Sequence, residues 1–129
     1  MAIPTIASRL ERRCIVMSGD AGLVMRLRER LPPGWDLAQT GDLDTLGGFG
    51  EILQYRFLLL DLDDGSGVDP LEVLRKARVE LMLNIPIFCF GGETAVRDQA
   101  RLARADRFFE REEIVARLAG FCEQFGWGN

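Results

Sequence analysis

A cluster of carboxylates directly follows an apolar run near the middle of the chain. The run at 57–60 leads into Asp61, and Asp63 and Asp64 follow before a Gly-Ser-Gly loop at 65–67. A carboxylate in such a place can attack phosphorus or help to hold Mg²⁺. An unbroken apolar run is typical of a central strand of a parallel sheet. Ligands of such sheets gather outside the carboxyl ends of the strands, so Asp61 is the candidate functional residue.

Few other residues that do chemistry accompany these carboxylates. The chain contains no histidine, which removes the usual general base and the commonest zinc ligand. Cys14, Cys89 and Cys122 are far apart in apolar surroundings, and this predicts buried, reduced thiols rather than a disulfide framework or a metal site. Lys76 is the only lysine.

Length and composition indicate one globular domain. The 129 residues are 47% apolar and 28% charged, which is ordinary for a soluble protein. A net charge of −4 argues against nucleic acid and anionic membranes as partners. No apolar run approaches the ~20 residues of a membrane span, and residues 1–13 lack the apolar core of a secretory signal. We therefore expect a cytoplasmic protein.

Strand and helix patterns alternate five times along the chain. Short apolar runs predict strands at 13–17, 35–38, 57–61, 85–90 and 107–109. Apolar spacing and capping residues predict helices at 23–31, 42–54 (weakened by glycines), 69–84, from 94 onward, and at 114–125 with Gly126 as the cap. We expect an N-terminal arm at 1–11, a domain at 12–125 and a tail at 126–129.

Such alternation predicts an α/β fold with right-handed crossovers and helices on both faces of a parallel sheet. Five units fit the flavodoxin-like doubly wound (βα)5 form, with strand order 2-1-3-4-5 in a single domain.

This architecture, with an aspartate closing the third strand, resembles the receiver domain of bacterial response regulators over about residues 12 to 125. The most similar pieces are 58–61, the fourth strand 85–90 and the approach to the fifth strand at 105–108. The resemblance implies a bacterial protein in which Asp61 takes a phosphoryl group from a histidine kinase. In the family, two acidic residues after the first strand help to hold Mg²⁺, while a Thr or Ser ending the fourth strand and a Lys ending the fifth contact the phosphoryl oxygens.

The sequence departs from that pattern at most of the supporting positions. Ser18 and Gly19 stand in place of the acidic pair, with Asp20 one position later, and Gly91 replaces the hydroxyl residue. Arg111 falls nearest to the lysine position. Each lost hydrogen bond to a charged group costs ~1.5–3 kcal/mol.

We therefore interpret the chain as a degenerate receiver, or pseudo-receiver, with no catalytic residue and no cofactor. Mg²⁺ at Asp20 and Asp61 remains an open alternative, to which Asp63 would add an oxygen unless it belongs to a hydrated loop. A working phospho-acceptor at Asp61 is the alternative function. A remote alternative is a haloacid dehalogenase-type phosphatase, which the stretch 61–66 resembles, but no lysine follows Lys76.

A stand-alone receiver without an output domain acts by docking. Arg97, Arg101 and Arg104 recur at helical spacing and predict one exposed stripe, which would suit an acidic partner or remain solvated. The resemblance implies docking through the fourth helix, fifth strand and fifth helix, to another signalling protein or a second copy of the chain. Phe108 aligns with an aromatic switch residue of the family, and the alternative is a plain core residue.

Overall fold

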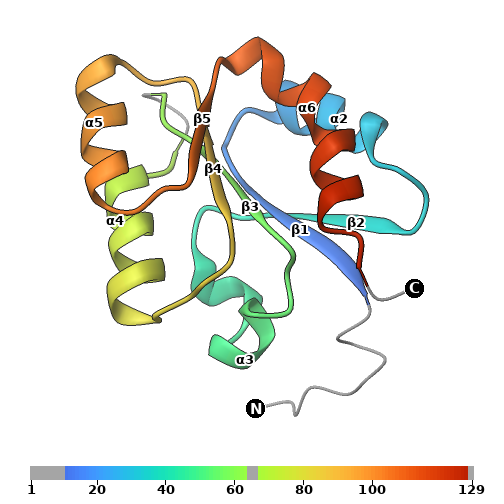
Figure 1. Cartoon of the computed structure of the whole chain (residues 1–129), viewed down its shortest axis with the longest axis horizontal. Coiled ribbons are helices and arrows are strands. Elements are labelled where there is room, and N and C mark those ends of the chain that lie inside the picture. The colour runs from blue at the N-terminus through green and yellow to red at the C-terminus, as the bar shows by residue number, and fades with distance from the viewer. Residues whose placement is uncertain (1–10, 64–66, 128–129) are drawn as a thin grey trace.

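The computed structural model describes residues 11–63 and 67–127. Its centre is a five-stranded sheet in the order β2-β1-β3-β4-β5, with every neighbouring pair parallel (Figure 1). The strands are β1 (Arg12–Met17), β2 (Trp35–Gln39), β3 (Leu58–Asp61), β4 (Ile87–Phe90) and β5 (Arg107–Phe109). The predicted doubly wound fold and strand order are confirmed.

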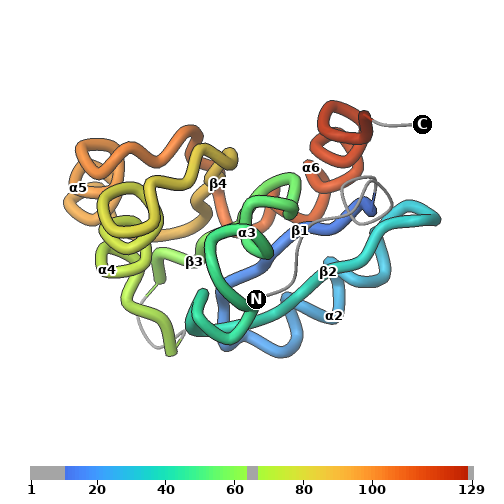
Figure 2. Tube along the Cα trace, turned by 90° about the horizontal axis from the view of Figure 1, so that it is seen from below, coloured from blue at the N-terminus to red at the C-terminus, as the bar shows by residue number. Residues whose placement is uncertain are grey.

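Helices cover both faces of this sheet (Figures 1 and 2). The helices α2 (Ala21–Arg30) and α6 (Arg111–Gln124) lie on one face. The other face carries the 3₁₀ turn η1 (Leu43–Leu46), α3 (Phe49–Ile52), α4 (Pro70–Arg75) with its π-helical continuation η2 (Lys76–Glu80), and α5 (Thr94–Leu102). Two hydrophobic clusters therefore fill the molecule, one on each side of the sheet.

The central strand explains how Asp61 is aimed. All four residues of β3 are buried, because β1 and β4 flank it and helices cover both faces. Leu59 packs in the cluster beneath α2 and α6, whereas Leu58 and Leu60 pack in the opposite cluster. Side chains alternate along a strand, so Asp61, two residues after Leu59, shares its direction towards α2 and α6.

An aromatic cluster fixes α6 against the sheet. Phe121 of α6 stacks on Phe88 of β4 with ring centroids 4.4 Å apart, and it meets Phe109 of β5 edge-on at 5.3 Å. Phe57, before β3, contacts Phe121 at 5.8 Å. Such pairs stabilise by ~0.5–1.5 kcal/mol each beyond their burial. They hold α6 in place, and with it the residue at its N-terminus, Arg111.

Three local predictions differ from the structure. The predicted helix 42–54 is broken into η1 and the short α3, because Gly47 between them adopts φ +113°. The helix predicted at 69–84 leaves α-geometry after Arg75 and ends at Glu80. Gly126 is not the predicted left-handed cap: Phe125 is the C-cap of α6, and Gly126 instead permits a close approach, since a Cβ there would lie 2.8 Å from the Cys122 carbonyl oxygen.

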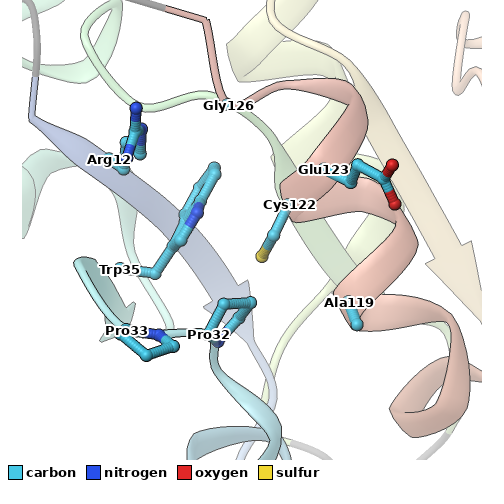
Figure 3. Close-up of a pocket in the computed structure, with 8 residues that line it drawn as sticks. All are labelled: Arg12, Pro32, Pro33, Trp35, Ala119, Cys122, Glu123 and Gly126. Carbon is cyan, nitrogen blue, oxygen red and sulfur yellow. The ribbon is translucent and has the colours of Figure 1, made fainter. Parts of the chain in front are cut away.

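A cavity of about 320 Å³ is lined by residues at the amino ends of β1 and β2 (Figure 3). Asp61 lies at the carboxyl end of β3, which is the other end of the parallel sheet. Its walls come from the start of β1, the loop that leads into β2 with the first residue of that strand, the C-terminal turns of α6 and the residues just after it, namely Arg12, Pro32, Pro33, Trp35, Ala119, Cys122, Glu123 and Gly126. Burial raises the pKa of the Cys122 thiol to about 11, so this thiol stays protonated at neutral pH. All three cysteines are free and buried, as predicted.

Candidate functional site

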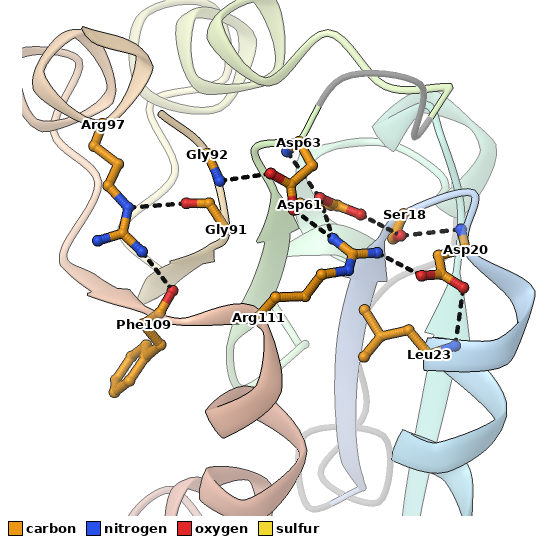
Figure 4. Close-up of polar contacts among 10 residues, drawn as sticks. All are labelled: Ser18, Asp20, Leu23, Asp61, Asp63, Gly91, Gly92, Arg97, Phe109 and Arg111. Atoms are coloured by element: carbon orange, nitrogen blue, oxygen red, sulfur yellow. Dashed lines mark hydrogen bonds and ion pairs between the residues drawn. The ribbon is translucent and has the colours of Figure 1, made fainter. Parts of the chain in front are cut away.

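Asp61 lies at the carboxyl end of β3 with no solvent exposure. Its Oδ2 accepts a hydrogen bond from the Ser18 hydroxyl at 2.6 Å (Figure 4). Its Oδ1 accepts from the Asp63 backbone N–H and from Nη1 of Arg111, both at 2.9 Å. Each oxygen of this buried carboxylate is therefore hydrogen-bonded, as a buried charge requires.

The turn between β1 and α2 supplies two polar side chains to the site. Ser18, which is 2% exposed, accepts a hydrogen bond from the Asp20 N–H at 3.1 Å while its hydroxyl donates to Asp61. Asp20 is the N-cap of α2, since its Oδ1 accepts from the Leu23 N–H at 3.1 Å. Its other oxygen, Oδ2, is turned towards Arg111 (Figure 4). Gly19 between them is exposed.

Arg111 is the first residue of α6, and its guanidinium lies among three carboxylates (Figure 4). Nη1 donates to Asp61 at 2.9 Å and to Asp63 at 2.8 Å, and Nη2 donates to Asp20 at 2.5 Å. The start of α6 is itself fixed, because the Glu110 N–H donates to the Glu113 carboxylate at 2.8 Å. The planar fork of arginine suits such bridging.

The pKa values reflect this cluster. Burial alone would lower the pKa of Arg111, but its hydrogen bonds to Asp61 and Asp20, together with the charge of Asp61, outweigh burial and raise that pKa, so the guanidinium stays charged. The hydrogen bond from Arg111, and then that from the Leu23 N–H, lower the pKa of Asp20 below its ordinary value. Three carboxylates against one guanidinium leave the contact group with two net negative charges when all are ionised.

The end of β4 completes the site. Gly91 and Gly92 adopt φ +70° and +83°, a left-handed backbone that favours glycine. The Gly92 N–H donates to Asp63 Oδ1 at 2.8 Å. The structure thus brings together Ser18, Asp20, Asp61, Asp63, Gly91 and Arg111 of the residues singled out in the sequence.

The predicted stripe of arginines is wrong for Arg97. Its Nε donates to the Gly91 carbonyl at 2.9 Å and its Nη2 to the Phe109 carbonyl at 2.8 Å, so the side chain folds back over the ends of β4 and β5 (Figure 4). The prediction of an exposed Arg97 came from helical spacing alone. The contact arises because Arg97 lies in the first turn of α5, within reach of these strand ends.

The other members of the predicted partner face lie nearer the surface. Arg101 is exposed, pairs with Asp98 at 2.9 Å and lies over the Phe108 ring at 4.7 Å. Arg104 is exposed and donates to the Arg78 carbonyl at 3.1 Å. Phe108 is half-buried and packs against the cluster beneath α4 and α5.

The arrangement of these residues does not fit Mg²⁺. A divalent cation needs free carboxylate oxygens, but the Arg111 guanidinium donates to all three carboxylates that surround it. Among the described residues, no group of three or more carboxylates, histidines or cysteines is arranged to hold a metal ion.

The sequence did not reveal the roles of Ser18 and Asp63 in this site. Ser18 was noted only as a replacement for an acidic residue, yet its hydroxyl holds Asp61. For Asp63 the sequence left two interpretations, a cation ligand or part of a hydrated loop. In the structure its carboxylate instead accepts hydrogen bonds from both Arg111 and the Gly92 N–H. The Gly91-Gly92 pair was the available signal, because successive glycines after a strand often admit a close approach from another segment. Asp64 and Ser66, which belonged to the phosphatase-like stretch, lie outside the described residues.

Several solved structures with a similar fold are response regulators or their receiver domains. The phosphorylated cyanobacterial phytochrome response regulator RcpA matches with a TM-score of 0.68 and 13% identity, over 89% of this chain and 94% of that one. A response regulator receiver protein from Pseudoalteromonas atlantica matches with a TM-score of 0.65 and 13% identity, over 88% and 95%. The receiver domain of a modulated diguanylate cyclase from Desulfovibrio desulfuricans G20 matches at 0.64 and 12% identity, over 88% and 92%.

The chain therefore has the receiver-domain fold, as its sequence predicted. No protein-family model matches the sequence, and no curated protein matches it significantly. Within the part of the chain that the structure describes, no helix has the length and apolar character needed to span a bilayer.

Proposed function

We propose that this chain is a receiver-like signalling module of a two-component-type pathway that acts by docking to another protein and does not accept a phosphoryl group. The observation that carries the proposal is the position of Arg111, whose guanidinium contacts Asp20, Asp61 and Asp63 at once. In this account Arg111 is a built-in cation that takes the place of a metal ion.

The electrostatics of the site support this function. A transferred phosphoryl group brings negative charge that must be neutralised where it develops. Here the one guanidinium is already shared among three carboxylates, so the site has no positive charge to spare. Asp61, the residue that would accept a phosphoryl group, is also held by hydrogen bonds at both of its carboxylate oxygens.

The fold and the exposed face of α5 support docking as the mode of action. We propose that Arg101, Arg104 and Phe108, without Arg97, belong to the contact face for an acidic partner or a second copy of the chain. Arg101 and Arg104 are exposed on a chain whose net charge is −4, so they form a local positive region on an acidic protein.

The test is titration with Mg²⁺ and beryllium fluoride, followed by amide NMR and thermal unfolding. We expect no saturable change in the wild type, and the same result for Asp61→Asn. A saturable shift in the wild type that Asp61→Asn abolishes would favour the second candidate, a working phospho-acceptor. That candidate keeps one supporting observation, the buried carboxylate at the tip of the central strand.

A further inference from the structure

The side chain of Asp63 occupies space that a side chain at the end of β4 would otherwise fill. A Cβ built on Gly91 would lie 2.2 Å from Asp63 Oδ2 and 2.7 Å from its Cγ, which is far inside van der Waals contact. Gly91 is thus the residue that admits the carboxylate between the ends of β3 and β4 (Figure 4).

Both oxygens of this carboxylate are held by donors that suit an anion. Oδ1 accepts from the Gly92 N–H at 2.8 Å, and Oδ2 accepts from Arg111 Nη1 at 2.8 Å. A backbone N–H on a left-handed turn combined with a guanidinium is a common way to bind an oxyanion. The same Nη1 donates to Asp61, so this anion site adjoins the tip of β3.

We propose that Asp63 is the internal ligand of an oxyanion site formed by the Gly92 N–H and Arg111, and that it keeps this site permanently filled. Without the Asp63 carboxylate, the Gly92 N–H and the Nη1 donor of Arg111 that now hold it would be free to bind a tetrahedral oxyanion such as phosphate. The inference rests on the proposed function, in which Asp61 carries no phosphoryl group, and it adds how the site is regulated: the chain's own carboxylate keeps the site in its anion-bound form.

The occupied site is connected to the face proposed for docking. The Gly91 carbonyl accepts from Arg97 Nε at 2.9 Å, and Arg97 also holds the Phe109 carbonyl of β5. The carboxylate in the site therefore fixes the Gly91-Gly92 turn, and Arg97 joins that turn to α5 and β5. The Asp63 side chain is 41% exposed, so a small ion from solvent can reach the site once the carboxylate is gone.

The test is hydrogen exchange of the Gly92 amide, measured by NMR in the wild type and in Asp63→Ala. We expect exchange in the variant to be about tenfold faster, because its acceptor is lost. Inorganic phosphate at millimolar concentration should then slow this exchange again and shift the Gly92 and Arg111 signals saturably. In the wild type, phosphate should change neither the exchange rate of the Gly92 amide nor the Gly92 and Arg111 signals. Asp98→Ala is the matched control, since it removes an aspartate that pairs with an exposed arginine elsewhere on the surface.

Unchanged Gly92 exchange in Asp63→Ala would overturn the inference, as would the absence of a saturable response to phosphate. The isosteric Asp63→Asn covers the case in which Asp63→Ala does not fold. Its amide oxygen can still accept from Gly92, so we expect protection there to persist while the Arg111 guanidinium signals shift; unshifted signals would contradict the proposal. None of these measurements uses a phosphoryl donor, so their failure is distinct from that of the proposed function, which phosphorylation of the wild type at Asp61 would show.

Discussion

Replacing Arg111 by alanine removes the positive charge on which the candidate site depends. The change leaves Asp61 fully buried, and among the described residues only the Ser18 hydroxyl and the Asp63 N–H still donate to it. It also leaves Asp20 and Asp63 without their cation. The variant should therefore be less stable than the wild type, and it should gain affinity for divalent cations.

The contacts set the size of the loss. Removing one partner of a buried ion pair costs ~3–5 kcal/mol, and the side chain of Asp61 has no exposure. Asp20 and Asp63 have side chains 40% and 41% exposed, so solvent screens their pairs with Arg111 and each pair contributes little. Since Arg111 itself is 28% exposed, we take the lower end and expect a loss of about 3 kcal/mol in the free energy of unfolding.

The assay is urea unfolding of the wild type, Arg111→Ala and Arg101→Ala, each with and without Mg²⁺. Arg101→Ala is the matched control, because Arg101 and Asp98 have side chains 60% and 63% exposed and their pair should contribute less than about 1 kcal/mol. In Arg111→Ala the three carboxylates lose their shared guanidinium, and we expect them to draw together around a divalent cation that their present arrangement does not hold. Mg²⁺ at ten times its Kd should then restore ~1.4 kcal/mol.

Two results would refute this reasoning. One is an equal loss of stability in Arg111→Ala and Arg101→Ala, which would show that the buried contact with Asp61 contributes little. The other is stabilisation of the wild type by Mg²⁺ to the same extent as Arg111→Ala, which would show that the guanidinium does not exclude the metal.

Two further predictions concern Asp20 and Gly91. The pKa of Asp20 is lowered in the folded state by Arg111 and then by the Leu23 N–H, so its contribution to stability is complete above the ordinary value of 3.8 and is lost as pH falls through the lower folded pKa. Urea unfolding between about pH 2 and 7 should show a shallower acid decline in Asp20→Asn than in the wild type, and parallel curves would contradict this. Gly91→Ala should cost about 1–3 kcal/mol through its φ of +70° and the contact with Asp63, whereas Gly50→Ala, where a Cβ meets nothing within 4 Å, should be nearly neutral. In an Asp63→Ala background, Gly91→Ala should lower the free energy of unfolding by less than it does in the wild type. Equal losses in the two backgrounds would show that the Asp63 side chain does not crowd a side chain at position 91.

The sequence predicted the fold because its patterns are local. An unbroken apolar run marks β3 as a central strand, and it places Asp61 at the strand end without any knowledge of the neighbours. The break at Gly47 was less predictable, since glycine only weakens a helix, and here the left-handed turn ends it.

The site was predicted only in part, because its contacts join segments far apart in the chain. Its position in the sequence predicted that Arg111 lies near Asp61. Which carboxylates the guanidinium contacts depends on how α6 packs against the sheet and on the direction of the Arg111 side chain. The contacts of Arg111 with Asp20 and Asp61 span 91 and 50 residues. Arg97 shows the opposite error, because helical spacing predicts a face but not a long side chain that turns back at a helix start.

The most direct measurement is the intact mass of the wild-type protein after incubation with acetyl phosphate and Mg²⁺, read beside Asp61→Asn. With Arg111 shared among the three carboxylates, the account predicts that the two proteins keep unaltered masses. A gain of one phosphoryl group in the wild type that is absent from Asp61→Asn would contradict it.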